Sequence, residues 1–536
     1  MSKLTFEYRI GKSVSLGRVK KMLRDELNLV EASTDLVEIT CMDSFDWRIY
    51  ASSGVIESEN NNGSTLLSWR TLNSHDYLFS VETNKKIDFA WNLPDGEMKK
   101  RLSKALKVRA LLPQVVLRVK RNHWVKLDRE QKTVVRAVLE DIQLWDKEKD
   151  SFRKLEIRIR LIPVRGYQKA IERAGKLLRN IAIVEQTDID IYLTALTTQN
   201  RKPGDYKPKA VIPLLPEMRT DQATKAALLA MLNMLEANES GVRNNIDSEF
   251  LHDYRIAVRK TRSAFSQIKG VFPKHVVDRY RNQFAWLGGL TSPARDMDVY
   301  LLKLESYRNM LPKKLRIHLD PLRSVIVSKR DGSYKALAKA LSGKRYHRLL
   351  SDYREFLTSP VPLQTRLPNA SKPVKLVANQ RIWKMYRRVM KEGKGINEKS
   401  PDEDLHELRK TCKKLRYLIE FFQSLYDADQ MSHLIVFLKK LQDNLGDFND
   451  LHVQKEALEG LLVDMENFGP VSAETEQAIA ELIAQLDHLQ MEKRKEFAGQ
   501  FSLFCKKENI RLYRQLFNMG SQNINNQIDQ LEQIEN

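Results

Sequence analysis

One stretch of the chain occurs twice: LHDYRIAVRKTRSAFSQI at residues 251–268 and LHELRKTCKKLRYLIEFF at residues 405–422. The two copies start 154 residues apart, at residues 251 and 405. The same offset at separate places indicates internal duplication rather than a chance match. Both copies have the residue spacing of an amphipathic helix. The offset also pairs Leu287 with Leu441, Asp296 with Asp450, and Val299 with Val453.

Each copy places its basic and apolar side chains on different faces of the predicted helix. The basic residues lie at positions i, i+3, i+7 and i+10, so they share one face over ~15 Å of helix. An apolar stripe follows another face and would pack into a core. In the first copy the basic face consists of His252, Arg255, Arg259 and Arg262, and in the second of His406, Arg409, Lys413 and Arg416.

Like charges on one helical face repel, at a cost of a few tenths of a kcal/mol per i, i+4 pair, which a bound anion would offset. Arginine offers phosphate oxygens a planar fork and lysine a mobile point charge, so the mixture suits a polymeric phosphate better than a small ligand. The alternative is a solvated face whose cations pair with acids along the helix. The histidines fit a structural hydrogen bond at the helix start nearly as well as ligand contact. A related basic stripe contains Arg381, Lys384 and Arg388.

The whole chain is basic. It has 536 residues, and 90 Lys and Arg against 69 Asp and Glu give a formal net charge of +21. Such a charge attracts anionic partners, among them nucleic acid, polyphosphate and anionic membranes. The acids are interspersed with the bases, which indicates folded domains with basic surfaces rather than a basic tail.

The cysteine content and the hydropathy predict a cytoplasmic location. Cys41, Cys412 and Cys505 lack the spacing of a zinc site or a disulfide framework. The N-terminus has no signal-peptide pattern, and no stretch of ~18 apolar residues could span a bilayer. We therefore expect no membrane span.

The length predicts two or three domains, and the sequence pattern predicts where they lie. Short alternating runs over about 1–200 indicate an α+β domain with an antiparallel sheet. Turn formers accumulate over 201–219, which we interpret as a linker. Helical spacing over 220–525 predicts an all-α domain, with repeats at about 220–365 and 370–525.

The helical region resembles the CHAD domain family. The resemblance rests on His252, Arg255, Arg259, Lys260 and Arg262. The second copy repeats this motif with His406, Arg409, Lys410, Lys413, Lys414, Arg416 and Tyr417, and the segment from Leu441 to Asp450 follows it. The resemblance implies two pseudo-symmetric four-helix bundles and a basic surface that binds inorganic polyphosphate, in association with polyphosphate granules in many members.

The N-terminal region resembles CYTH domains, which have the triphosphate-tunnel fold, in the segments from Cys41 to Tyr50 and from Leu112 to Trp124. Active members of that family open with a Glu-x-Glu-x-Lys strand that holds a metal ion. Here the corresponding stretch is TFEYR at residues 5–9, so one carboxylate is missing. Glu57 and Glu59 stand where an Arg-x-Arg pair is expected. Lys154, Glu156, Arg158 and Arg160 stand where alternating carboxylates are expected.

These departures predict a degenerate tunnel without the convergent oxygen ligands that Mg²⁺ or Mn²⁺ needs. We therefore expect no metal, no cofactor and no catalysis. Polyphosphate binding is the leading interpretation. One alternative is metal-dependent triphosphatase activity of the first domain, and a second is non-specific nucleic-acid binding. The predicted polyphosphate-binding residues are His252, Arg255, Arg259, Lys260, Arg262, Arg381, Lys384, Arg388, His406, Arg409, Lys410, Lys413, Lys414 and Arg416.

Overall fold

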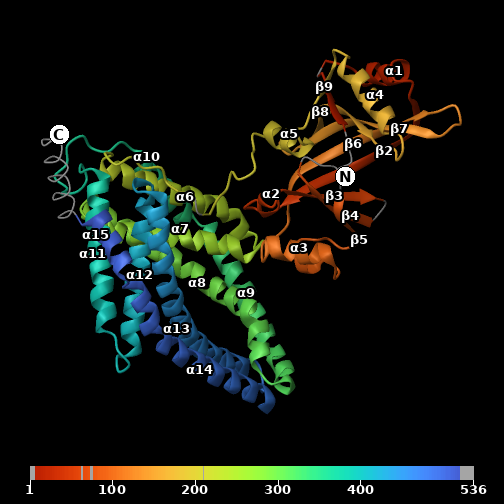
Figure 1. Ribbon diagram of the computed structural model, residues 1–536. Helices are drawn as coiled ribbons and strands as arrows, with labels where there is room; N and C mark the ends of the chain where they lie inside the picture. Colours follow the sequence, from red (N-terminus) through yellow and green to blue (C-terminus); the bar gives the residue numbers. More distant parts are fainter. Residues whose placement is uncertain (1–5, 12, 62–63, 73–76, 209–210, 519–536) are drawn as a thin grey trace. The chain divides into compact units, whose positions relative to one another are not determined.

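The computed structural model describes residues 6–11, 13–61, 64–72, 77–208 and 211–518. The chain divides into two compact units, unit 1 at 1–208 and unit 2 at 209–536 (Figure 1). The division falls inside the stretch 201–219 that the sequence marks as a linker. None of the helices in the described ranges has the length and hydropathy that a bilayer span requires.

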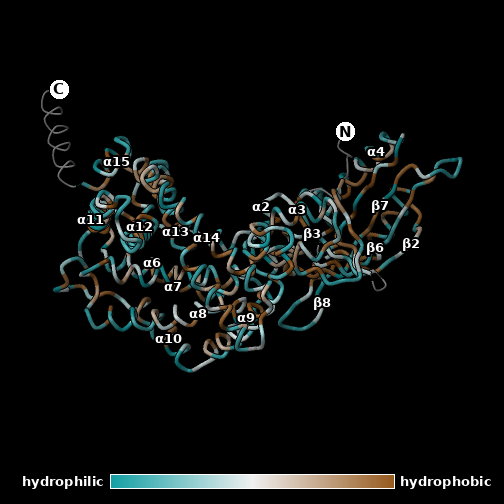
Figure 2. The backbone as a smooth tube through the Cα atoms, turned by 90° about the horizontal axis from the view of Figure 1, so that it is seen from below, coloured by the Kyte–Doolittle hydropathy of each residue, from teal (hydrophilic) through white to brown (hydrophobic). Residues whose placement is uncertain are grey.

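Unit 1 is an α+β fold, as predicted. Its described strands form one nine-stranded antiparallel sheet in the order β5-β4-β3-β2-β6-β7-β8-β1-β9. Strands β6 and β7 have long apolar stretches (Figure 2), and every second residue of β6 from Val115 to Val119 is buried. The strands are β1 Phe6–Ile10, β2 Val30–Asp43, β3 Gly54–Asn61, β4 Ser64–Thr71, β5 Tyr77–Thr83, β6 Leu112–Leu127, β7 Thr133–Asp146, β8 Ser151–Ile162 and β9 Val184–Gln186.

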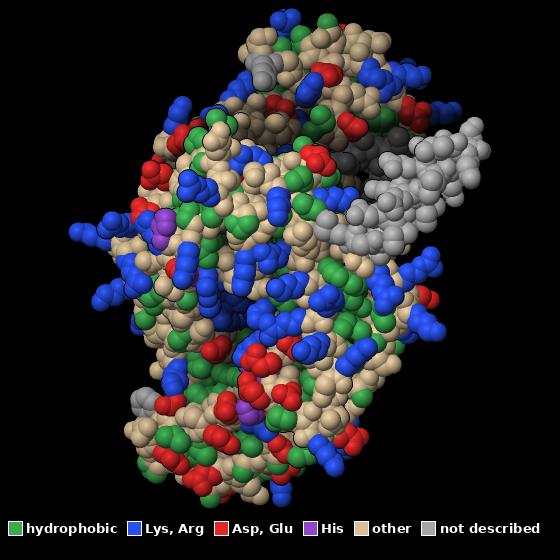
Figure 3. Space-filling view, turned by 90° about the vertical axis from the view of Figure 1, so that its left-hand side faces the viewer, with side chains coloured by type: hydrophobic (Ala, Val, Ile, Leu, Met, Phe, Trp, Pro, Cys, Tyr) green, Lys and Arg blue, Asp and Glu red, His purple; other side chains and the backbone are tan. Residues whose placement is uncertain are grey.

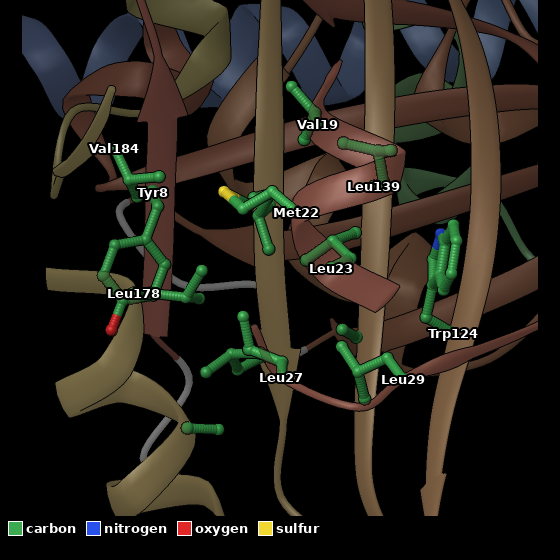
Figure 4. Close-up of a cluster of buried hydrophobic side chains, with 14 of the residues drawn as sticks. Tyr8, Val19, Met22, Leu23, Leu27, Leu29, Trp124, Leu139, Leu178 and Val184 are labelled. Carbon is green, nitrogen blue, oxygen red and sulfur yellow. The ribbon is translucent and has the colours of Figure 1, made fainter. Parts of the chain in front are cut away.

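Helices cover the sheet through separate apolar clusters. In one cluster, α1 and α4 pack against β1, β6 and β7, and Figure 4 shows Tyr8, Leu23 and Leu178 converging there. Helix α5 begins at the N-cap Asp190 and packs Tyr192 and Leu196 against β2, β6 and β7. Helix α3 covers β3 and β4. The bounds are α1 Leu16–Asp25, α2 Arg48–Ala51, α3 Glu97–Leu106, α4 Gln168–Arg179 and α5 Ile191–Thr198.

The sheet curls, and side chains from both ends of its strand order therefore meet. Arg70 of β4 binds Asp190, which follows the edge strand β9, at 2.5 Å, and Glu57 of β3 at 2.7 Å. Side chains from β2 to β8 and the first residue of α5 line a cavity of only about 40 Å³. Ligand pockets usually have roughly 300–1,000 Å³, so the interior of the curled sheet has room for little more than water.

Buried ion pairs fill this interior. Arg121 lies 3.2 Å from Glu59, and Arg160 binds Glu140 at 2.9 Å. Arg158 is held by Glu7 and Glu156. The cations at 158 and 160 stand where the resemblance implies carboxylates, and the structure shows them paired with carboxylates of their own strand and of neighbouring strands. They are therefore not available to an added anion, and the carboxylates are not available to a metal.

Unit 2 is all-helical, as predicted, and its two halves correspond. Helices α6, α7 and α8 begin at residues 220, 248 and 274, and α11, α12 and α13 begin 154 residues later, at 374, 402 and 428. The first half contains α6 Thr220–Arg243, α7 Ser248–Gln267, α8 Lys274–Met310, α9 Asp320–Leu341 and α10 Lys344–Thr358. The second contains α11 Val374–Gly395, α12 Asp402–Phe422, α13 Ala428–Phe468, α14 Ala473–Phe504 and α15 Lys507–Phe517.

The described part of each half thus has five α-helices, one more than the four-helix bundles that the resemblance implies. The long hairpins α8–α9 and α13–α14 extend beyond their own halves and lie side by side (Figure 1). They share one core, in which Leu304 and Leu322 of the first half are buried with Leu458 and Leu482 of the second. This shared core joins the halves and fixes their relative position.

We predict that Arg70→Ala destabilises unit 1 by about 3–5 kcal/mol, because it leaves Glu57 and Asp190 buried without a counter-charge. Chemical denaturation of the full chain, followed by tryptophan fluorescence and by helical circular dichroism, measures the effect. The change should appear in the fluorescence transition, because five of the seven tryptophans lie in unit 1. Adding Glu57→Gln and Asp190→Asn, which removes the two unpaired buried carboxylates, should restore most of the stability. Unchanged stability of Arg70→Ala would show that the ion pairs do not support the sheet.

Candidate anion-binding surface

The two repeat helices, α7 and α12, contact each other, and together with α8 they line a pocket of about 330 Å³. Six of its lining residues are Lys or Arg, and none is acidic. Figure 3 shows Lys and Arg side chains gathered around a hollow on one face. We call this site the inter-repeat pocket; it is lined by Arg259, Arg262, Ser263, Ser266, Arg281, Asn282, Ala285, Lys410, Lys413, Lys414 and Tyr417.

The core of each repeat helix holds its basic face in place. Leu251 and Tyr254 of α7 are fully buried, as are Leu408 and Leu415 of α12. Asp247 is the N-cap of α7, and its carboxylate accepts hydrogen bonds from two backbone N–H groups of the first turn. The apolar stripes thereby fix which residues point outward, as the sequence pattern predicts.

Most of the pocket's charge is not neutralised. Among the residues that the structure describes, no ion pair joins Arg259, Arg262, Lys413 or Lys414 to a carboxylate. Lys410 pairs with Glu407 of its own helix at 2.7 Å. Arg281 lies 3.8 Å from Asp278 and is exposed. A set of converging cations without counter-charges is a site prepared for an anion.

Two basic side chains of the repeat helices have lowered pKa values. Burial, together with Arg409 and Arg259 nearby, lowers the pKa of Lys413 to about 8. Burial and the neighbouring Arg259 lower the pKa of Arg255 to about 10. In both cases burial and the neighbouring cations outweigh the attraction of a carboxylate, Asp450 for Lys413 and Asp296 for Arg255.

Three of the four predicted residues near the start of the repeat helices contact neighbouring helices. Arg255 donates to Thr291 Oγ1 at 2.8 Å and to Ser292 Oγ at 3.1 Å, both on α8. Its counterpart Arg409 binds Asp450 of α13 at 3.0 Å. His406 Nδ1 lies within hydrogen-bonding distance of Asn449 Oδ1, and His252 is half-buried. None of these four lines the pocket.

The remaining predicted residues lie outside the pocket as well. Lys260 and Arg416 both bind Glu420, at 2.8 and 2.6 Å. On α11, Arg381 donates to the Lys269 carbonyl at 3.0 Å. Lys384 is exposed, and Arg388 pairs with Glu392 at 2.6 Å. The pocket therefore collects five of the predicted residues: Arg259, Arg262, Lys410, Lys413 and Lys414.

Polar pocket residues that the prediction omitted come from the same helices. Ser263 and Ser266 lie four and seven positions after Arg259, so helical periodicity places them on its face. Tyr417 follows Lys413 at the same four-residue spacing. Arg281 and Asn282 come from α8, and only the packing of α8 beside α7 could bring them there.

One group of side chains could offer ligands to a metal ion. Glu403, His406 and Glu407 each place one ligand atom within 4.8 Å of the other two. The two glutamates are exposed, and Glu407 holds Lys410. His406 is engaged with Asn449. Two of the three side chains, His406 and Glu407, thus already have partners within the protein.

A family model matches most of the helical region. Residues 226–459 match the family model of the CHAD domain, which confirms that the helical region contains this domain. The chain is similar to the CHAD domain from the plant Ricinus communis, with 22% identity over 55% of this chain and 94% of that one and a TM-score of 0.47.

Two further solved structures are similar to parts of the chain. PptA from Streptomyces chartreusis is 16% identical over 53% of this chain and 100% of its own, with a TM-score of 0.41. A protein from Pyrococcus horikoshii is 13% identical over 37% of this chain and 99% of its own, with a TM-score of 0.23. The comparison with curated proteins gave no match.

We predict that Lys413→Met stabilises the ligand-free protein at pH 7 by about 1 kcal/mol, the scale of one partly exposed charge interaction. Folding lowers the pKa of Lys413 to about 8, so between pH 8 and its higher unfolded value the unfolded state binds more protons. Wild-type stability should therefore rise relative to the variant in that range.

The measurement is the difference in unfolding free energy between the two proteins at pH 7, 8, 9 and 10, without added polyanion. Groups common to both proteins cancel in this difference. The advantage of the variant should shrink as the pH rises. A variant that is less stable than wild type at pH 7 would show that Lys413 has a counter-charge in the folded protein.

Proposed function

We propose that the CHAD domain of this chain binds inorganic polyphosphate in the inter-repeat pocket and performs no chemistry on it. The observation that carries the proposal is the meeting of both repeat copies at one pocket, where four of the six cations have no ion pair with a carboxylate of the described residues. Anions that enter the pocket would relieve the repulsion that lowers the pKa of Lys413. Within this proposal the protein is cytoplasmic, and granule association follows from the ligand.

A polymeric phosphate fits the site better than a small anion does. Six cations from three helices line the pocket, more positive charge than one orthophosphate neutralises. Further exposed cations, such as Lys384 on α11 and Arg348 on α10, lie on other helices of the unit. A chain held at one cation makes its next contact intramolecularly, so binding strengthens with chain length.

Nucleic acid is a weaker candidate for the same pocket. Single strands bind through bases stacked on aromatic side chains as well as through phosphates. Tyr417 is the only aromatic residue among the described pocket-lining residues. The pocket thus offers the electrostatic part of nucleic-acid binding and little of the stacking part.

Unit 1 supports the non-catalytic part of the proposal. Metal-assisted hydrolysis needs carboxylates free to hold the ion. Glu7 and Glu156 are bound by Arg158, Glu57 by Arg70, and Glu140 by Arg160. Glu7 and Glu156 lie in the segments where active CYTH domains carry carboxylates, and Arg158 holds both. We propose that the unit has a structural role.

We predict that charge reversal of Arg259, Arg262, Lys413 and Lys414 to Glu weakens binding of long polyphosphate by at least ~100-fold, equal to about 2.7 kcal/mol. Each reversal replaces an attraction by a repulsion in a confined site. Fluorescence titration with labelled polyphosphate of about 100 units at 150 mM salt measures the effect. Helical circular dichroism checks that the variant is folded.

A matched control reverses four exposed cations of unit 1: Arg129, Lys147, Lys149 and Lys169. It changes the net charge by the same amount, and we expect it to weaken binding less than ~5-fold, because none of these cations lines the pocket and exposed charges outside it are screened at this salt concentration. Equal losses in the two variants would mean that only net charge matters. Unchanged binding in the pocket variant would rule out the pocket.

We predict that the full chain does not hydrolyse tripolyphosphate or ATP in the presence of Mg²⁺ or Mn²⁺. The carboxylates are held by arginines, and the small cavity leaves no room for the substrate. Release of orthophosphate measures hydrolysis, with an active triphosphatase as the positive control. Turnover that requires metal, stops with chelator and disappears in Glu7→Gln would overturn the prediction.

A further inference from the structure

The two repeats depart from their symmetry at a position that decides where an anion fits. Under the 154-residue offset, Lys260 corresponds to Lys414, Arg262 to Arg416, and Ser266 to Glu420. The first two pairs keep their charge, and the third exchanges a hydroxyl for a carboxylate. Two equivalent groups of side chains therefore lie at the α7–α12 contact, and only one of them has its own anion.

In the occupied group, Glu420 takes the place of a ligand. Lys260 of α7 binds one carboxylate oxygen at 2.8 Å, and Arg416 of α12 donates Nε to the other at 2.6 Å. The Glu420 side chain is 16% exposed, so this is a largely desolvated ion triad. Burial opposes ionisation of Glu420, but the two cations outweigh it and lower its pKa.

In the open group, the corresponding cations have no such partner. Lys414 and Arg262 both line the inter-repeat pocket, and the structure's described residues include no carboxylate paired with either. Ser266 lines the same pocket, with its hydroxyl donating to the Arg262 carbonyl at 2.8 Å. A serine is shorter than a glutamate, and the space it leaves is part of the pocket.

We propose that the group formed by Lys414, Arg262 and Ser266 is a subsite for one phosphate unit of a polyphosphate chain, and that Glu420 closes the equivalent subsite of the other half. This inference rests on the proposed function and adds to it the side on which the polyphosphate chain enters the pocket. The chain enters on the Arg262 side and is excluded from the Lys260 side. One binding path exists where the duplicated fold would otherwise offer two.

The chemistry of the two anions supports this assignment. An interior phosphate unit carries one negative charge and presents two non-bridging oxygens, as a carboxylate does. The cations at Lys260 and Arg416 already satisfy such a pair of oxygens, one each. The same two residue types at Lys414 and Arg262 can bind phosphate oxygens through charge-assisted hydrogen bonds.

Exchanging the residues at 266 and 420 tests the proposal. Isothermal titration with tripolyphosphate, which can place one of its phosphate units in the subsite, should give one equivalent bound to the wild type. Ser266→Glu should supply an internal anion to the open subsite and weaken this binding about tenfold or more, since hydrogen bonds to charged groups contribute roughly 1.5–3 kcal/mol. Glu420→Ser should open the second subsite and bind two equivalents. The double exchange should return to one equivalent, because it moves the carboxylate to the other half.

Ser324→Glu is the control for the added charge, because Ser324 is exposed on α9 and does not line the pocket. It should bind like the wild type. Should Glu420→Ser unfold, Ser266→Glu and the double exchange still decide the matter, with thermal melting to check folding.

The outcomes separate this inference from the proposed function. A wild type that binds neither tripolyphosphate nor long polyphosphate overturns both. A wild type that binds long polyphosphate, with Ser266→Glu binding as tightly and Glu420→Ser gaining no second equivalent, overturns the subsite alone.

Discussion

The cations of α7 and α12 repel one another where the two helices meet, and the rest of unit 2 has to overcome this repulsion. Arg259 and Lys413 are equivalent positions of the two repeats, and after burial the charge of Arg259 helps to lower the pKa of both Lys413 and Arg255. The repulsion persists because the apolar stripes on the other faces of both helices are buried, and because the α8–α9 and α13–α14 hairpins share a core. The core thus contributes the stability that holds the like charges together.

The two units hold their cations in different environments. In unit 1, Arg70, Arg158 and Arg160 each have carboxylate partners inside the curled sheet. In unit 2, Arg262 and Lys414 face an open pocket without one. Paired charges in a confined interior support the fold, whereas unpaired charges beside an open pocket attract a ligand. This contrast is the reason for assigning anion binding to the helical unit and a structural role to the sheet.

The sequence predicted those features that depend on periodicity. The repeat helices, their buried stripes and their basic faces follow from spacing along one element, and the structure confirms the α+β and all-helical regions. The sequence did not predict which cations remain free. Lys260 and Arg416 share the face of the other predicted residues, but Glu420, a residue of the second copy alone, neutralises both. Pairing across helices depends on tertiary packing, which a spacing argument does not contain.

The same limit explains the interior of unit 1. Alternation predicted its strands, but the partner of Arg70 is Asp190, 120 residues away, and only the curl of the sheet brings them together. Likewise, α8 contributes Arg281 to the pocket through packing beside α7.

The central claim is that the inter-repeat pocket selects polyphosphate among polyanions. Competition titration at physiological salt tests it most directly: labelled polyphosphate bound to the full chain is challenged with RNA and with heparin at equal concentrations of anionic groups. Selection predicts that unlabelled polyphosphate displaces the label at much lower concentration than either competitor. Displacement by RNA or heparin at the same concentration as polyphosphate would contradict the account and leave a general polyanion-binding surface.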